Sequence, residues 1–158
     1  MKGNFASLLI VLVTALAAAT PSLQAKTSHC SAASAAGLWA YTYTGTAYSA
    51  EGPVADASVG HFHQDAAGNV TGSQTHNLGG AWEVEDISGS ITTSRDCTAT
   101  GTISVFVGGV LQRTATLAGV YDSDMNHIRY IFETLTLPDG TVLPVVITID
   151  GNRLRPAD

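Results

Sequence analysis

Eight short apolar segments, separated at near-regular intervals by Gly, Asn and Asp, constrain the fold of this chain more than any other feature. Leu38–Thr46 shows the pattern best: Trp39, Tyr41 and Tyr43 share one face and smaller residues the other. Alternation of period two is typical of a β-strand with one buried face. No segment has the period of an amphipathic helix, so the sequence predicts an all-β protein.

Short connections between the segments predict the order in which the strands pair. Gly108-Gly109 is typical of a tight hairpin, and Asp65–Asn69 and Pro138–Gly140 are typical of slightly longer turns. Strands joined in this way form an antiparallel meander. The expected strands are 38–46, 54–64, 70–78, 82–93, 97–107, 110–121, 127–137 and 141–150.

A meander of eight strands has two exposed edges unless its first and last strands pair. We therefore predict an eight-stranded antiparallel up-and-down β-barrel, closed or nearly closed, whose interior is filled by side chains or holds one small ligand. The alternative is a two-sheet sandwich, which normally needs longer crossovers than this chain offers. Pro144 cannot donate a ladder hydrogen bond and marks a bulge or an imperfect seam in the last strand.

The first 25 residues have the pattern of a secretory signal peptide. Lys2 is followed by an apolar run from Phe5 to Thr20, and cleavage is expected after Ala25. The alternative is a retained membrane anchor, but the run is shorter than the roughly 20 residues that a spanning helix needs. We expect a secreted or periplasmic protein with one domain, residues 26–158, which is long enough for a single core.

Charge limits the partners of the expected mature chain. Without Lys2, six basic residues oppose thirteen acidic ones, a formal charge of −7. Such a chain repels phosphate backbones and anionic lipids. We therefore expect no nucleic-acid partner and no membrane insertion after cleavage, whereas a small-molecule ligand and an oligomer are both compatible with the sequence.

The two cysteines, Cys30 and Cys97, predict one disulfide bond if the chain is exported. The bond would close a loop of 66 intervening residues, a constraint that stabilises the fold by roughly 4 kcal/mol in the chain-entropy model. Free thiols and an intermolecular bridge are the alternatives.

His61 and His63 lie on one face of an expected strand, a spacing that can ligate a metal. A hairpin centred on Ala67 places Ser73 and Thr71 opposite them, and neither is a good ligand. His76 falls on the other face in this register, so the pair lacks a third ligand. We predict two solvent-facing histidines and no metal site.

Weak catalytic candidates are Glu133 and Arg129, which share a face of the strand 127–137. Inside a barrel, a carboxylate is desolvated and can act as a general acid or base. If Tyr130 and Phe132 face the interior instead, Glu133 and Arg129 form an exposed pair. An acidic stretch beside Trp82, made of Glu83, Glu85 and Asp86, is interpreted as a solvated strand end. No nucleophile or phosphate-binding motif is present, and no cofactor is expected.

Several segments resemble a group of small exported, mostly uncharacterised bacterial proteins related to allene oxide cyclase-like and dirigent-like barrels. The resemblance is carried by Gly37–Gly45, Val59-Gly60, Phe62, Asp65–Gly72, Ser88–Thr93 and Asp96–Thr100. It implies an eight-stranded barrel, but no catalytic motif of those enzymes has a counterpart here. Gly37-Leu38-Trp39 is also similar to the Gly-x-Trp opening of lipocalins, with Arg153 or Arg155 as the packing partner of the Trp.

Three functions are compatible with these observations. The first is a binding protein that holds a small apolar or aromatic ligand inside the barrel. The second, suggested by the cyclase resemblance, is a cofactor-independent cyclase or isomerase. The third is a packed barrel with a structural or surface-interaction role. The first is favoured because no acid–base pair is evident in the interior. The expected ligand-binding residues are Trp39, Tyr41, Tyr43, Tyr130 and Phe132.

Overall fold

The computed structural model describes residues 30–156, which form nine strands and one short helix. The expected signal peptide and its cleavage point lie outside these residues. The elements are α1 (Ala32–Ala35), β1 (Gly37–Ser49), β2 (Gly52–Gln64), β3 (Asn69–Leu78), β4 (Ala81–Thr93), β5 (Thr98–Val107), β6 (Val110–Tyr121), β7 (His127–Thr136), β8 (Val142–Leu143) and β9 (Val145–Pro156).

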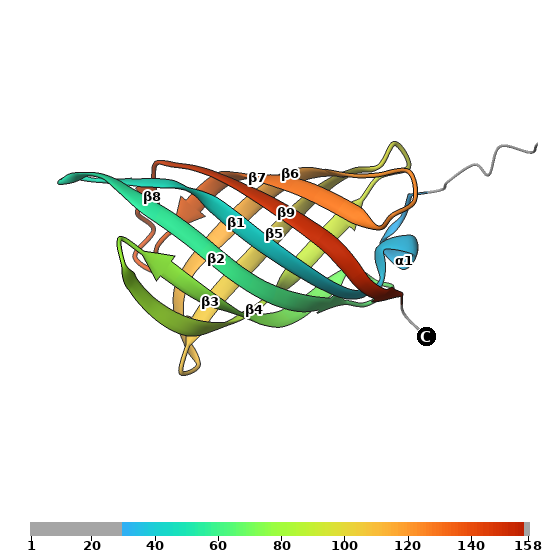
Figure 1. Ribbon diagram of the computed structural model, residues 1–158, viewed down its shortest axis with the longest axis horizontal. Coiled ribbons are helices and arrows are strands. Elements are labelled where there is room, and N and C mark those ends of the chain that lie inside the picture. The colour runs from blue at the N-terminus through green and yellow to red at the C-terminus, as the bar shows by residue number, and fades with distance from the viewer. Residues whose placement is uncertain (1–29, 157–158) are drawn as a thin grey trace, which may run out of the picture.

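Eight of the strands close into a barrel (Figure 1). Neighbours in sequence pair antiparallel from β1 to β7, β7 pairs with β9, and β9 returns to β1. β8 is a two-residue strand that pairs with the end of β7. The predicted closed antiparallel barrel is therefore confirmed, and the sandwich is wrong because one continuous ring of pairs includes the first and last long strands.

The register of the hairpin β2–β3 is the one that the sequence predicts. His61 pairs with Ser73 and His63 with Thr71. Both histidines are exposed on the outer wall, whereas His76 is buried and faces the interior. A shift by one residue would have exchanged the two faces, so this turn determines which histidine enters the barrel.

The last strand differs from its expected bounds. Pro144 interrupts it, as predicted, and separates β8 from β9. The strand does not end at Asp150 but continues through Gly151 to Pro156. A side chain at Gly151 would bring its Cβ to 2.9 Å from Ile128. Gly151 therefore serves close packing between strands rather than a turn.

One end of the barrel is closed by the segment that precedes β1 (Figure 1). The sequence analysis found no helix, but Ala32–Ala35 form one short helix, because Ser31 and Ser34 make a reciprocal capping box. Trp39 is completely buried and donates to the Ala35 carbonyl at 2.9 Å. Among residues 30–156, no helix is long and apolar enough to cross a membrane.

Two further contacts hold this closed end. Cys30 and Cys97 form the predicted disulfide bond, which ties the segment before α1 to the start of β5. Arg153 packs over the Trp39 ring, 5.0 Å from its centroid, and donates to the Ser34 carbonyl. Structural disulfides persist in oxidising compartments, so the bond supports an extracytoplasmic location.

The opposite end is the open end, where the β1–β2, β3–β4 and β5–β6 turns project (Figure 1). No segment of the described chain corresponds there to α1. The two ends of the barrel therefore differ: a disulfide and a buried tryptophan hold the segment that covers one end, whereas the other end is formed by hairpin turns.

We predict that reduction of the Cys30–Cys97 bond lowers the melting temperature of the protein. Closing a loop of this length contributes roughly 4 kcal/mol by the chain-entropy model, several degrees or more in melting temperature. The check is calorimetry with and without reductant, using Cys30→Ser/Cys97→Ser as the reference. The double variant should melt at the lower temperature and be insensitive to reductant. Two titratable thiols in unreduced native protein would contradict the assignment.

Candidate ligand site

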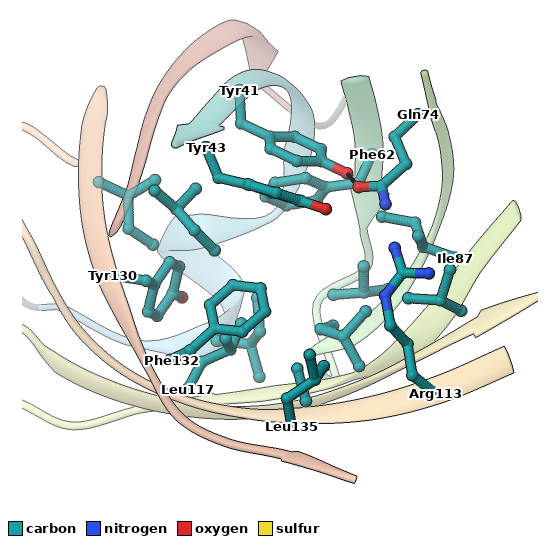
Figure 2. A pocket seen from close by; sticks show the side chains of 17 residues that line it. Tyr41, Tyr43, Phe62, Gln74, Ile87, Arg113, Leu117, Tyr130, Phe132 and Leu135 are labelled. Carbon is teal, nitrogen blue, oxygen red and sulfur yellow. Dashed lines mark hydrogen bonds between the residues drawn. The ribbon is translucent and has the colours of Figure 1, made fainter. Parts of the chain in front are cut away.

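A small apolar cavity lies in the middle of the barrel, with a volume of about 60 Å³. Figure 2 shows aromatic rings of β1 and β2 facing those of β7 across it. The sides are completed by aliphatic residues of the other strands, and the polar side chains that reach it besides the tyrosines are Gln74 and Arg113. Its aromatic lining consists of Tyr41, Tyr43, Phe62, Tyr130 and Phe132.

A larger cavity of about 430 Å³ lies at the open end, and we call it the mouth. Its apolar lining comes from the strand ends around the opening, and its polar lining from Asp56, His76, Glu83, Gln112 and Arg113. Arg113 and Leu135 line both cavities. The two spaces are therefore neighbours along the barrel, with Arg113 between them. The apolar lining residues are Ala47, Leu78, Ala81, Trp82, Leu135, Leu137 and Leu143.

The volumes decide where a ligand fits. A buried apolar cavity of ~150 Å³ accommodates benzene, so the inner cavity of about 60 Å³ is too small for even one aromatic ring as it stands. Pockets for small organic molecules typically measure ~300–1,000 Å³, and the mouth, at about 430 Å³, lies within that range. The body of a ligand therefore fits the mouth, and only a narrow end reaches the inner cavity.

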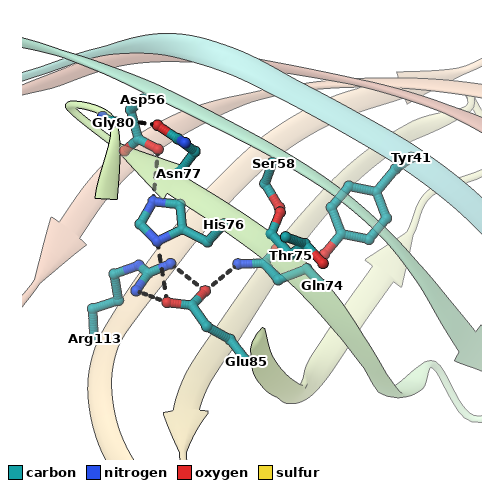
Figure 3. A network of polar contacts seen from close by, with 10 residues as sticks. All are labelled: Tyr41, Asp56, Ser58, Gln74, Thr75, His76, Asn77, Gly80, Glu85 and Arg113. Atoms are coloured by element: carbon teal, nitrogen blue, oxygen red, sulfur yellow. Dashed lines mark hydrogen bonds and ion pairs between the residues drawn. The ribbon is translucent and has the colours of Figure 1, made fainter. Parts of the chain in front are cut away.

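A buried ion pair includes Arg113, the residue that lines both cavities. Figure 3 shows its contacts. Arg113 of β6 donates from both terminal nitrogens to Glu85 of β4, at 2.6 Å to each carboxylate oxygen. Glu85 is completely buried. Planar, bidentate pairing of this kind is the strongest geometry available to a guanidinium and a carboxylate.

Further hydrogen bonds satisfy the remaining acceptors of Glu85 and link it to β1 and β2. Gln74 donates to Glu85 at 2.5 Å and accepts from the Tyr41 hydroxyl at 2.6 Å. His76 lies 3.2 Å from Glu85 through Nδ1 and 2.8 Å from Asp56 through Nε2. Five side chains are thus joined to Glu85 directly or through one partner, and we call the whole set the charged layer: Tyr41, Asp56, Gln74, His76, Glu85 and Arg113.

The protonation states in the charged layer follow from these contacts. Burial alone would lower the pKa of His76, but its hydrogen bonds to Asp56 and Glu85 raise that pKa to about 9. Burial alone would raise the pKa of Glu85, but hydrogen bonds with His76, Arg113 and Gln74 lower it to about 2. At neutral pH, two cations therefore balance the two carboxylates, Asp56 and Glu85, which is the condition for burying charge at acceptable cost.

Because the charged side chains are paired with one another, few groups of the charged layer are available to react with a substrate. Both ring nitrogens of His76 face carboxylates, so neither is open to a substrate. The pKa of the Tyr41 hydroxyl lies above its usual range, mainly because the group is buried and also because the Glu85 charge is near. Tyr41 therefore stays protonated. Ligand atoms of His76, Glu83 and Glu85 lie within 4.8 Å of one another, but Arg113 already occupies both oxygens of Glu85.

The sequence-predicted ligand residues divide into two groups. Tyr41, Tyr43, Tyr130 and Phe132 come together around the inner cavity. Trp39 lies at the closed end, where it stacks on Phe62 and contacts Tyr121, and it lines neither cavity described above. Its place beneath Arg153 indicates a packing role for the ring.

Neither weak catalytic candidate faces the interior. Glu133 is exposed on the outer wall, and Arg129 is exposed there too, 3.8 Å from Asp150. Tyr130 and Phe132 of β7 face the interior instead, which is the arrangement in which Glu133 and Arg129 were expected to be exposed. The structure thus brings Glu133 into neither cavity.

Sequence reasoning missed the charged layer. It grouped Glu85 with Glu83 and Asp86 in a solvated strand end; Glu83 and Asp86 are exposed, but Glu85 is buried and paired with Arg113. It also found no acid–base pair in the interior, which is wrong. The available signal was alternation, since Glu85 shares the face of Ile87 and Ile91, both of which are buried.

The fold and these cavities define a small closed β-barrel with an opening at one end. No family model and no curated protein matches the chain. Among solved structures, the chain is similar to a redesigned beta barrel, mFAP1, determined bound to DFHBI. The identity is 18%, the match covers 77% of this chain and 97% of that chain, and the TM-score is 0.49.

We predict that His76→Gln lowers the free energy of unfolding by about 2 kcal/mol at pH 7 and removes a pH dependence. The pKa of folded His76, about 9, lies above the ordinary value of 6.5, so its contribution to stability is complete below pH 6.5 and is lost as pH rises through 9. Urea unfolding from pH 6 to pH 10 measures both effects.

The matched control is His61→Gln, since His61 lies on the exposed outer face of the neighbouring strand. It should leave stability within ~0.5 kcal/mol of wild type across this range. Equal pH profiles for the two variants would show that His76 carries no buried charge.

We also predict that the purified protein takes up no stoichiometric Zn²⁺ at neutral pH. Within residues 30–156, His61 and His63 have no third ligand, and Arg113 and protonated His76 place two positive charges where a metal would bind Glu85. Metal analysis after incubation with Zn²⁺ and desalting tests this. About one ion per chain, lost in Glu85→Gln or His61→Ala, would contradict it and indicate which cluster binds.

Proposed function

We propose that this protein binds a small, predominantly apolar or aromatic molecule at the open end of its barrel. The ligand occupies the mouth, with its narrow end directed past Leu135 toward Tyr41, Tyr43, Tyr130 and Phe132. The protein acts outside the cytoplasm, secreted or periplasmic, which the Cys30–Cys97 bond supports.

The observation that carries this proposal is the mouth itself. It combines a volume of about 430 Å³ with a lining of leucines, alanines and one tryptophan, interrupted by a few polar side chains. Sites for small molecules typically have this composition, since the apolar wall supplies affinity and the polar groups supply orientation.

An enzyme of the cyclase or isomerase type is the second candidate, because charged side chains lie at the base of the mouth. Such a reaction needs a group that can accept or release a proton in contact with the substrate. In the charged layer, His76 and Glu85 are saturated by one another, Asp56 and Arg113. Binding without turnover is therefore the function that the geometry favours, and a packed barrel with a surface role is the remaining alternative.

Filling the mouth should abolish binding. We predict that Ala47→Trp, which places an indole in the mouth, weakens binding of the neutral fluorescent probe N-phenyl-1-naphthylamine at least tenfold. Titration of the probe, followed by its fluorescence, gives the dissociation constant. Because the mouth has room for the indole, the melting temperature should change little.

The matched control is Ala57→Trp, because Ala57 is exposed on the outer wall of β2. This variant should bind the probe as wild type does. An equal loss of probe binding in both variants would contradict a ligand site in the mouth and favour the inert barrel, as would a wild-type protein that binds neither this probe nor a charged amphiphile.

A further inference from the structure

We propose that the mouth selects ligands whose apolar body carries a cationic head group, such as an alkyl or aryl amine or a quaternary ammonium. The inference deepens the proposed function and rests on it.

Glu83 carries the charge of the mouth that the protein does not neutralise. It is exposed on β4, and the residues described by the structure offer its carboxylate no hydrogen bond and no ion pair. Its oxygen lies within 4.8 Å of a nitrogen of His76, but that ring is already held between two other carboxylates. A ligand head group in the mouth therefore meets an available negative charge.

The positive charges of the mouth are not available in the same way. Arg113 directs both terminal nitrogens to Glu85, and His76 directs both ring nitrogens to Asp56 and Glu85. An anionic head group would have to compete with a buried bidentate carboxylate for Arg113, while a cation competes with nothing for Glu83. The lining of the mouth thus favours a cationic head group over an anionic one.

A tryptophan stands at the rim of the mouth, next to Glu83 in β4 but on the opposite face of that strand from Glu83 and Glu85. Trp82 lines the mouth and is 68% exposed. The face of a tryptophan ring attracts ammonium groups, and the attraction is largest for quaternary ammonium ligands enclosed by aromatic surface.

The open end of the barrel as a whole also carries a net negative charge. The residues of the strand ends and turns around the mouth, 47–56, 76–86, 105–113 and 135–145, include six carboxylates against two cations, Arg113 and protonated His76. A mouth of this charge raises the local concentration of cations and slows the approach of anions. The carboxylates are Glu51, Asp56, Glu83, Glu85, Asp86 and Asp139.

Three eight-carbon competitors test the inference: octyltrimethylammonium, octanol and octanoate, each displacing N-phenyl-1-naphthylamine at pH 7. Octyltrimethylammonium should displace the probe at a concentration at least tenfold lower than octanoate, with octanol between them. Since exposed charges are screened by salt, 0.5 M NaCl should reduce this preference severalfold. Equal or inverted potency of the two ions, with the probe bound, would overturn the inference and leave the proposed function intact.

Two variants locate the selectivity. Glu83→Gln should reduce the preference for the cation about fivefold, and Trp82→Leu should weaken the cation without changing octanol. Glu133→Gln is the control, because Glu133 is an exposed carboxylate on the outer wall. Unchanged selectivity in Glu83→Gln, or the same loss in Glu133→Gln, would also overturn the inference.

Direct calorimetric titration of octyltrimethylammonium and octanoate decides the inference when the fluorescent probe itself does not bind. Saturable binding of the cation alone would support the selectivity. No saturable binding of either ion, together with no binding of the probe, would contradict the inference and the proposed function at once.

Discussion

Closure of the strand ring is the constraint on which the rest of the structure depends. Pairing of β9 with both β1 and β7 leaves an interior barely wide enough for side chains. Large rings therefore need small residues beside them. A Cβ at Gly119 would lie 2.0 Å from the Tyr130 ring, and one at Gly60 would lie 2.9 Å from the Tyr41 hydroxyl. Glycine and aromatic ring are matched across neighbouring strands, so closure accounts for both.

Closure also divides the interior into three levels with different chemistry. Trp39 and the disulfide fill the closed end, aromatic and aliphatic side chains fill the middle, and the charged layer lies nearest the opening. Charged groups are costly to bury, and the cost falls where a group is paired and close to water. The charged layer thus lies at the depth where Arg113 can pair with Glu85 and still face the mouth.

The sequence predicted the parts of this structure that local rules determine. Alternation and turn residues located the strands, and the turn at Asp65–Asn69 placed His61 outside and His76 inside. Local rules could not predict that Arg113 pairs with Glu85. Glu83 and Glu85 alternate onto the same face, and Arg113 reaches Glu85 from β6 across the intervening strand β5, a contact that depends on the register of two strand pairs. The volume of the cavities could not be predicted from the sequence either, because a strand with an aromatic inner face can belong to a barrel filled by side chains or to one that encloses a cavity.

The charged layer has a consequence for how a ligand is recognised. Breaking a buried ion pair by separating its partners costs several kcal/mol, so Arg113 and Glu85 form a rigid floor that a weakly bound molecule does not displace. The aromatic rings below that floor then contribute little to selectivity, although the sequence draws attention to them first. Selectivity belongs instead to the walls above it, where Trp82 and Glu83 adjoin the leucines of the mouth. Glu83, which the sequence assigned to a solvated strand end, is thus the residue on which the proposed selectivity depends.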